Sequence, residues 1–422
     1  MVTKEIQTGV FVHVLPTKQF ATTHIAVNFT QQLNRQTLNG RVLASNMLET
    51  ASAKYSSQTK FAQALSEMTG AAFGTEVFKV GQLHTVRLQL NLVHERFTTA
   101  GSHILNDGFD FLNEVINRPI GDEIAGFASV IFNRQKEMAL DEVAGLREDK
   151  PYYALREALQ AYFGVSDQAL PAFGTIDGLE ATTTQQAWQV WQDSVAHDRI
   201  DIVVVGGDVD FNKVITATSH FNFAPRRQLL QATYHQDLLP QVKQVKSQDE
   251  VTQARLVLGY SLVSNSDERF IANVFNGLFG GLAISRLFLH IREAAGLVYG
   301  ISSDYNPYTG LLLVEAGVDQ INLAITTTKI NEELQRLQQT LVSEEELAIV
   351  KQLLKTSYTM TLDQPLYLAD RLYNQQVLHQ ELTDEAWLAK IDAVTAAQVQ
   401  AFAQRAVLQL QYEMVGGDTN GD

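Results

Sequence analysis

The chain has 422 residues, 45% of them apolar and 19% charged, with a formal net charge of −15 at pH 7. This length is too great for one hydrophobic core, so we expect two or more domains, and the composition is that of a globular protein rather than a disordered one. The acidic balance argues against a nucleic-acid backbone or an anionic membrane as partner. The chain contains no cysteine, which excludes disulfide bonds, thiolate nucleophiles and Cys-ligated zinc.

The first residues, MVTKEIQTGVFVHVLPT, lack the basic and then apolar pattern of a secretory signal. The longest apolar runs, such as Ile202–Val205 and Leu311–Val314, have the length of strands and are far too short to span a membrane. We therefore expect a cytoplasmic protein without membrane or nucleic-acid partners.

The first half of the chain begins with alternating apolar residues, which predict strands, and continues with segments of helical spacing. In chain order we predict strands at Val10–Leu15 and Ile25–Phe29, helices at Leu38–Lys54 and Thr59–Met68, strands at Ala71–Lys79 and Leu83–Leu92, and helices from about Ser102 to Tyr162. A final helix and strand complete this half. The following span, rich in Gln and containing Pro240, predicts a linker at residues 226–243.

The end of the first half is repeated at the end of the chain. LEATTTQQAWQ (179–189) precedes an apolar strand and Gly206-Gly207-Asp208, and IDAVTAAQVQ (391–400) precedes a second strand and Gly416-Gly417-Asp418. Thr183 and Thr395 each resemble a helix N-cap with a Gln three residues later. No third glycine follows Gly206-Gly207, and the pair recurs at the end of the chain, so we interpret these glycines as strand ends rather than as a phosphate loop. The repeat predicts two related domains, at 1–225 and 244–422.

The second half has a similar order of elements. We predict a strand at Arg255–Leu262, helices within 268–294, strands at 297–305 and 310–318, and helices from 321 to 404. This order fits an α+β fold in which each half is a mainly antiparallel sheet covered by helices on one face.

Residues 285–300, SRLFLHIREAAGLVYG, carry the most specific pattern. Apolar residues with helical spacing form one stripe: Ile284, Leu287, Phe288 and Ile291. Gly296 then predicts the helix end, and Leu297, Tyr299 and Ile301 alternate as in a half-buried strand. This arrangement brings Arg292 near Tyr299, two donors able to stabilise an oxyanion. The alternative is a surface arginine and a packed tyrosine.

The histidines do not form a metal-binding pattern. No two of the ten are closer than nine residues, so no helix can present a His pair at i and i+4. His290-Ile-Arg-Glu293-Ala294 has alanine where a second histidine would be needed. For His84 and His94, beside apolar strand residues, we predict hydrogen-bonded structural roles. We therefore expect no metal ligand and no cofactor. The carboxylates of Glu344–Glu346 predict a helix start after Ser343.

Three segments, 285–319, 59–88 and 133–151, resemble the pitrilysin/insulinase family of zinc metallopeptidases, close to its small bacterial and mitochondrial-processing branch. The resemblance covers nearly the whole chain and implies the two-domain α+β fold predicted above. It also places Arg292 and Tyr299 on an Arg/Tyr pair of the family.

The same resemblance shows a deficit. Catalytic members of the family have His-x-x-Glu-His on the first domain's opening helix. With Met47 on the methionine that usually follows this motif, its five positions carry Val42, Leu43, Ala44, Ser45 and Asn46. Glu142 could correspond to the distant glutamate ligand, but we interpret it as a solvated helix residue. The resemblance therefore implies an inactive homologue without a zinc site.

The family contains heteromeric members in which one subunit holds zinc and the other does not. By resemblance we expect a non-catalytic subunit of a heterodimeric zinc peptidase, which adds a substrate-binding chamber and, in trans, Arg292 and Tyr299. Its partners would be a zinc-bearing peptidase of the same family and an extended peptide; a homodimer of the isolated chain stays open. The alternative is a peptide-binding or assembly scaffold with no catalytic contribution. An unrelated hydrolase finds no supporting motif, since no Gly-x-Ser-x-Gly is present.

Overall fold

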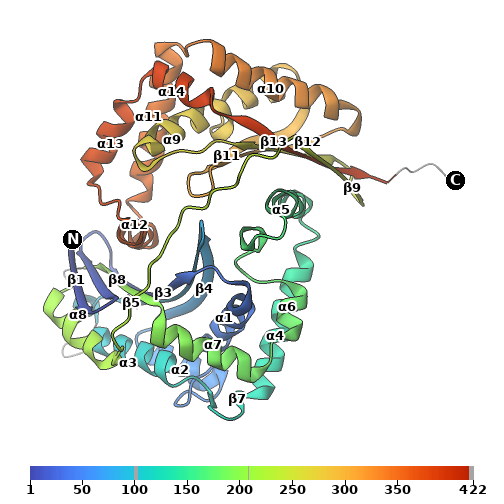
Figure 1. Ribbon diagram of the computed structural model, residues 1–422. Coiled ribbons are helices and arrows are strands. Elements are labelled where there is room, and N and C mark those ends of the chain that lie inside the picture. The colour runs from blue at the N-terminus through green and yellow to red at the C-terminus, as the bar shows by residue number, and fades with distance from the viewer. Residues whose placement is uncertain (99–102, 208, 418–422) are drawn as a thin grey trace. The chain divides into compact units, whose positions relative to one another are not determined.

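The computed structural model describes residues 1–98, 103–207 and 209–417 (Figure 1). Two compact units result, and each combines segments that are distant in the chain. Unit 1 contains Met1–Ala144, Leu170–Ala232 and Met360–Glu381, and unit 2 contains Gly145–Ala169, Thr233–Thr359 and the chain from Leu382 onward. These units describe packing, and the boundaries of two related domains at 225 and 244 stay a prediction. Residues 226–242, all described, form no helix or strand, as expected of a linker.

Unit 1 is built on a six-stranded sheet with the order β1-β2-β8-β3-β5-β4. Its strands are β1 (Val2–Gln7), β2 (Val10–Pro16), β3 (Thr22–Gln32), β4 (Ala72–Val80), β5 (Leu83–Val93) and β8 (Arg199–Gly206). β2 and β8 run parallel, whereas the other neighbours are antiparallel. A separate hairpin, β6 (Gly121–Asp122) and β7 (Gly126–Phe127), interrupts the long helical stretch expected after residue 102.

Most helices of unit 1 cover one face of this sheet. They are α1 (Arg35–Leu48), α2 (Gln58–Glu67), α3 (Ile104–Asn117), α4 (Ser129–Gly145), α6 (Ile176–Ala181), α7 (Thr184–His197) and α8 (Phe211–Thr218). Their apolar side chains form one core with alternate residues of the strands. The opposite face is covered by α12 (Pro365–Val377), whose buried Leu368, Leu372 and Tyr373 pack on Val203 and Val205 of β8.

Unit 2 has a five-stranded sheet with the order β11-β12-β10-β13-β9. Its strands are β9 (Lys243–Asp249), β10 (Ala254–Ser261), β11 (Val298–Asn306), β12 (Leu311–Val318) and β13 (Val407–Gly416). Only β9 and β13 are parallel. This order repeats that of β2-β8-β3-β5-β4 in unit 1, with a parallel pair at the same place. The edge strands β4 and β11 therefore correspond to each other.

The helices of unit 2 lie mainly on one face of its sheet (Figure 1). They are α9 (Arg269–Asn276), α10 (Leu323–Gln339), α11 (Glu344–Thr361), α13 (Asp384–Asp392), α14 (Ala396–Ala403) and two π-helical segments, Gly277–Gly281 and Leu287–Ala294. On the opposite face, α5 (Lys150–Phe163) packs Ala154, Ala158 and Tyr162 against Val257 and Leu410. Short 3₁₀ turns occur at Glu95–Phe97, Asp167–Ala169, Ser219–Phe221, Ser266–Glu268 and Gln320–Asn322.

The α+β prediction is confirmed, with one addition: a single helix also crosses the second face of each sheet. The repeat is equally visible in local structure, because Thr183 and Thr395 both form capping boxes with the Gln three residues later. Gly206 and Gly416 end β8 and β13, whereas Asp208 and Asp418 lie outside the described residues. The predicted helix start after Ser343 is confirmed. Among the described residues, no helix is both long and apolar enough to cross a membrane.

Candidate functional site at the β11 edge

Tyr299 lies on the edge strand of the unit 2 sheet, at a β-bulge. In the pairing of β11 with β12, Val298 faces Val318 and Gly300 faces Gly317, so Tyr299 is an extra residue without a partner. Val298 is buried while the Tyr299 side chain is 55% exposed. A bulge re-aims a side chain because it shifts the alternation of the strand by one residue. The predicted burial of Leu297, Tyr299 and Ile301 on one face is therefore wrong for Tyr299.

The predicted helix that precedes this strand is confirmed. It runs over Leu287–Ala294, with Leu287 and Ile291 buried in the unit 2 core. Gly296 has φ +62°, a left-handed conformation that glycine adopts without steric cost and that ends helices. The chain then enters β11 two residues later. Local sequence thus explains why Arg292 and Tyr299 lie close together.

The Arg292 side chain contacts the main chain of Tyr299 rather than its phenol. Nε of Arg292 donates to the carbonyl oxygen of Tyr299 at 3.1 Å, and Nη1 lies 3.2 Å from Oε1 of Glu293. The guanidinium also stacks over the Phe288 ring, 4.7 Å from its centroid. Arg292 therefore helps to fix the backbone at the bulge.

The hydroxyl group of Tyr299 has its own partner. It donates to Oδ1 of Asp319, just after β12, at 2.9 Å. This hydrogen bond and the negative charge of Asp319 raise the pKa of Tyr299, so the phenol keeps its proton near neutral pH. An exposed, protonated phenol can donate to a carbonyl oxygen, but a ligand at this position has to compete with Asp319.

The helix α1, which the resemblance aligns with the zinc-binding helix of catalytic relatives, carries no imidazole, carboxylate or thiolate side chain. Val42, Leu43 and Ala44 lie in the unit 1 core, and Ser45 is buried with its carbonyl bonded to the Thr75 hydroxyl. These residues do not fit a zinc ion, since structural and catalytic sites need imidazole, carboxylate or thiolate groups.

The remaining candidates for metal binding are dispersed. Glu142 is exposed on α4, as the sequence interpretation expected. His290 pairs with Glu333 at 3.0 Å, whereas Glu293 pairs with Arg292. Within the three described ranges, no group of three or more His, Asp or Glu side chains is placed to hold a metal ion.

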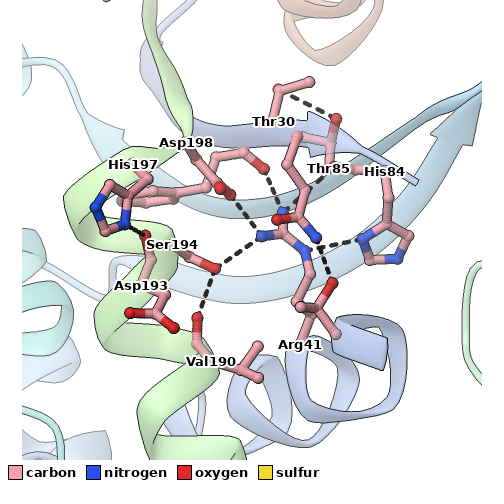
Figure 2. Close-up of polar contacts among 12 residues, drawn as sticks. Thr30, Arg41, His84, Thr85, Val190, Asp193, Ser194, His197 and Asp198 are labelled. Atoms are coloured by element: carbon pink, nitrogen blue, oxygen red, sulfur yellow. Dashed lines mark hydrogen bonds and ion pairs between the residues drawn. The ribbon is translucent and has the colours of Figure 1, made fainter. Parts of the chain in front are cut away.

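Sequence reasoning missed a buried polar cluster around Arg41, one residue before the degenerate motif (Figure 2). Arg41 is only 1% exposed. Its Nε donates to Nδ1 of His84 at 3.0 Å, Nη1 donates to Ser194 at 2.7 Å and to Asp198, and Nη2 donates to the Phe29 carbonyl at 2.8 Å. The one available signal was an arginine directly before the apolar residues Val42, Leu43 and Ala44.

The hydrogen bonds of this cluster define its protonation. Nδ1 of His84 accepts from Arg41, so Nε2 carries the proton and donates to the Ala172 carbonyl at 2.9 Å. Burial and the charge of Arg41 lower the pKa of His84 to about 3. Burial raises the pKa of Asp198, while its pairing with Arg41 opposes that rise. The predicted structural role of His84 is confirmed, and His94 likewise caps a short turn.

Comparison with known proteins agrees with this description. A family model described as Peptidase M16 inactive domain matches residues 191–354. The probable inactive metalloprotease YmfF of Bacillus subtilis strain 168 is 26% identical over 411 residues, covering 97% of this chain and 96% of YmfF. A crystal structure of a conserved protein from Enterococcus faecalis V583 is 31% identical, covers 100% and 99% of the two chains, and superposes with a TM-score of 0.93.

A more distant structure, a peptidase M16 inactive domain from Pseudomonas fluorescens, shares 17% identity and the fold, with a TM-score of 0.77 over the full length of both chains. The chain belongs to the M16 family of peptidases, the pitrilysin/insulinase family, and is an inactive homologue from its bacterial branch.

Proposed function

We propose that this chain is the zinc-free subunit of a two-chain peptidase and that it supplies Tyr299 and Arg292 to the substrate chamber. The zinc ion and the general base would come from a partner of the same family, and the substrate would be an extended peptide. A cytoplasmic location is part of the proposal. The observation that carries it is the bulge at Tyr299, which exposes a fixed donor on an edge strand.

The two candidate regions of the chain differ in a way that supports this division of labour. Val42, Leu43 and Ala44 at the motif positions of α1 pack into the core, and Ser45 and Asn46 beside them are not zinc ligands, so this chain contributes no metal ligand there. At β11 the polar groups are exposed instead, and Arg292 holds the carbonyl of Tyr299 in place. A chain that served only as a packed structural element would have no need of an exposed phenol on rigid backbone.

In the proposed complex, Tyr299 donates a hydrogen bond to the scissile carbonyl as negative charge develops on its oxygen. Arg292 keeps the bulge in the geometry that this donation requires. Removing one such donor from an oxyanion site typically lowers turnover by about 10²–10³-fold.

The test combines the purified chain with a zinc-bearing family member of the same organism and a library of quenched-fluorescent peptides. We expect Tyr299→Phe to lower turnover of the mixture by about 10²–10³-fold, with unchanged zinc content and complex formation. Tyr367→Phe is the matched control, because Tyr367 is also an exposed tyrosine, on α12. Full activity of the Tyr299→Phe mixture would remove the proposed role.

A specific observation favours the second candidate, a peptide-binding scaffold without a catalytic contribution. The Tyr299 hydroxyl already has an acceptor in Asp319. The variant Asp319→Ala separates the two functions. If Tyr299 is catalytic, its hydroxyl is released from Asp319 and turnover of the mixture is kept or raised. If the chain is a scaffold, neither Asp319→Ala nor Tyr299→Phe changes the turnover.

A further inference from the structure

The face of the unit 2 sheet opposite its main helix layer contains a groove that none of the roles above uses. It has a volume of about 230 Å³ and lies between the first turns of α5 and strands β10, β12 and β11. Its charged lining groups are Arg255 and Glu315, and its glycines are Gly300 and Gly317. All of these residues belong to unit 2.

Among the residues that the structure describes, Arg255 has no ion-pair partner in this groove. Its side chain is partly buried, and its Nε atom is buried without any hydrogen-bond partner among the described residues. A surface arginine that is simply hydrated would leave Nε accessible to water. Leaving the Nε–H group buried and unpaired costs free energy, so this donor is poised for an acceptor that the described residues do not supply.

Glycine on the neighbouring strand gives Arg255 its position. Arg255 of β10 and Gly317 of β12 are directly paired, and Gly317 in turn faces Gly300 of β11. The guanidinium lies so close to Gly317 that a Cβ atom there would come within 2.7 Å of Nη1. At Gly300 a Cβ would meet no atom within 4 Å, so the space is open up to the edge strand. The two glycines thus form a floor beside Tyr299.

Glu315 is the second charged residue that lines the groove. It lies two residues from Gly317 on β12, which places it about 7 Å further along the strand. Burial and the nearby Asp304 raise the pKa of Glu315. The groove therefore has an anion-binding end at Arg255 and an acceptor at Glu315, at a spacing that matches two residues of an extended peptide.

We propose that this groove is a carboxylate-binding subsite for peptides, in which Arg255 pairs with a peptide carboxylate and Glu315 accepts a peptide N–H. The inference rests on the proposed function for its ligand class and adds a preference that the function does not specify. The carboxylate is either the peptide C-terminus or an acidic side chain, since both present the same group to the guanidinium.

The test is peptide binding to the isolated full chain, followed through the amide signals of Gly300 and Gly317 by nuclear magnetic resonance. Three acetylated penta-alanine peptides serve as probes: one with a free C-terminus, one amidated with a central Glu, and one amidated and neutral. We expect one or both charged probes to bind about ten times more tightly than the neutral one, and the stronger of them identifies the source of the carboxylate.

Three variants in the groove and one control outside it test the role of the guanidinium. Arg255→Gln is expected to abolish the preference for charged probes, whereas Arg227→Gln, which removes one exposed arginine outside the groove, should leave it intact. Gly317→Ala keeps the charge of Arg255 but displaces its Nη1 atom. This variant should bind the charged probes more weakly and the neutral probe as before. Glu315→Gln should leave carboxylate binding equal or stronger.

Equal binding of all three probes, an unchanged preference in Arg255→Gln, or loss of carboxylate binding in Glu315→Gln would each overturn the proposal. The measurement needs no partner chain and no turnover. The two proposals can therefore fail separately. If the isolated chain prefers carboxylate probes but the mixed complex with Tyr299→Phe is fully active, the catalytic role of Tyr299 is refuted and the groove is established.

Discussion

The motif positions of α1 and the start of β11 are the two regions to which the family resemblance assigns a function, and their surroundings are opposite. At α1, Val42 and its neighbours are part of the apolar core, and the adjacent Arg41 is enclosed in a fully buried cluster. At β11, Tyr299 and Arg292 are exposed and held by hydrogen bonds to nearby groups. The difference teaches that the first region serves the packing of the core, whereas the second presents polar groups at the surface.

The comparison predicts that changes near α1 affect stability most. Arg41→Met leaves Asp198 and His84 buried without their donor, and loss of one partner of a buried pair costs about 3–5 kcal/mol of the free energy of unfolding. Urea denaturation measures the change. The double variant with Asp198→Leu should recover part of that stability, since it removes the unpaired charge. A loss below about 1 kcal/mol in Arg41→Met would show that the cluster is not structural.

The same cluster predicts how stability depends on pH. The pKa of His84 is about 3 in the folded chain, whereas in the unfolded chain it is near 6.5. Between these two pH values the imidazole is neutral in the folded state and protonated in the unfolded state. Protonation then favours the unfolded state, so this residue lowers stability as the pH falls below 6.5 and down to 3, by about 1.4 kcal/mol per pH unit. His84→Gln can replace both hydrogen bonds of the imidazole. In this variant the urea midpoint should depend less on pH between pH 6.5 and 4.5. An equal slope in both proteins contradicts this assignment.

For the β11 region we predict the opposite result, a small change in stability and a larger change in turnover. Arg292→Gln removes the hydrogen bond to the Tyr299 carbonyl, but both side chains are exposed, so unfolding should change by no more than about 0.5 kcal/mol. Turnover of the mixed complex should fall about tenfold, because the donor loses its fixed position. Arg292→Lys keeps the charge but not the same hydrogen-bond geometry. Its turnover in the mixed complex should therefore lie between that of the unchanged chain and that of Arg292→Gln. A stability loss as large as that of Arg41→Met would erase the contrast between the regions.

The smallest predicted effects compare the two repeats. Thr183→Ala and Thr395→Ala each remove the side-chain half of a capping box, which should cost about 1 kcal/mol in either unit. Thermal unfolding of the two variants checks whether the repeats remain equivalent in energy as well as in local structure. Thr→Ser at the same positions keeps the hydroxyl and is the matched control.

Local patterns were sufficient for much of the fold. Alternation and helical spacing located most strands and helices, although β1 and β9 were missed because they are short, polar and exposed on several residues. The packing of α5 on unit 2 and of α12 on unit 1 could not be read from sequence, since both helices are amphipathic segments that fit any apolar sheet face.

The candidate site shows the same division. The approach of Arg292 to Tyr299 follows from a helix end at Gly296, a local feature. The exposure of Tyr299 does not, because a bulge depends on how β11 pairs with β12 rather than on the composition of β11. The role of Arg255 was also invisible, as it needs glycines on two neighbouring strands.

The sequence by itself determined most of the element types and the approach of Arg292 to Tyr299, because both depend on residues within about one helix and the adjoining strand. Only the tertiary structure decided what surrounds them: the Arg41 cluster joins groups 43 and 157 residues apart, and strand register turns Tyr299 outward. Burial and register arise from contacts between distant segments, and no local periodicity encodes them.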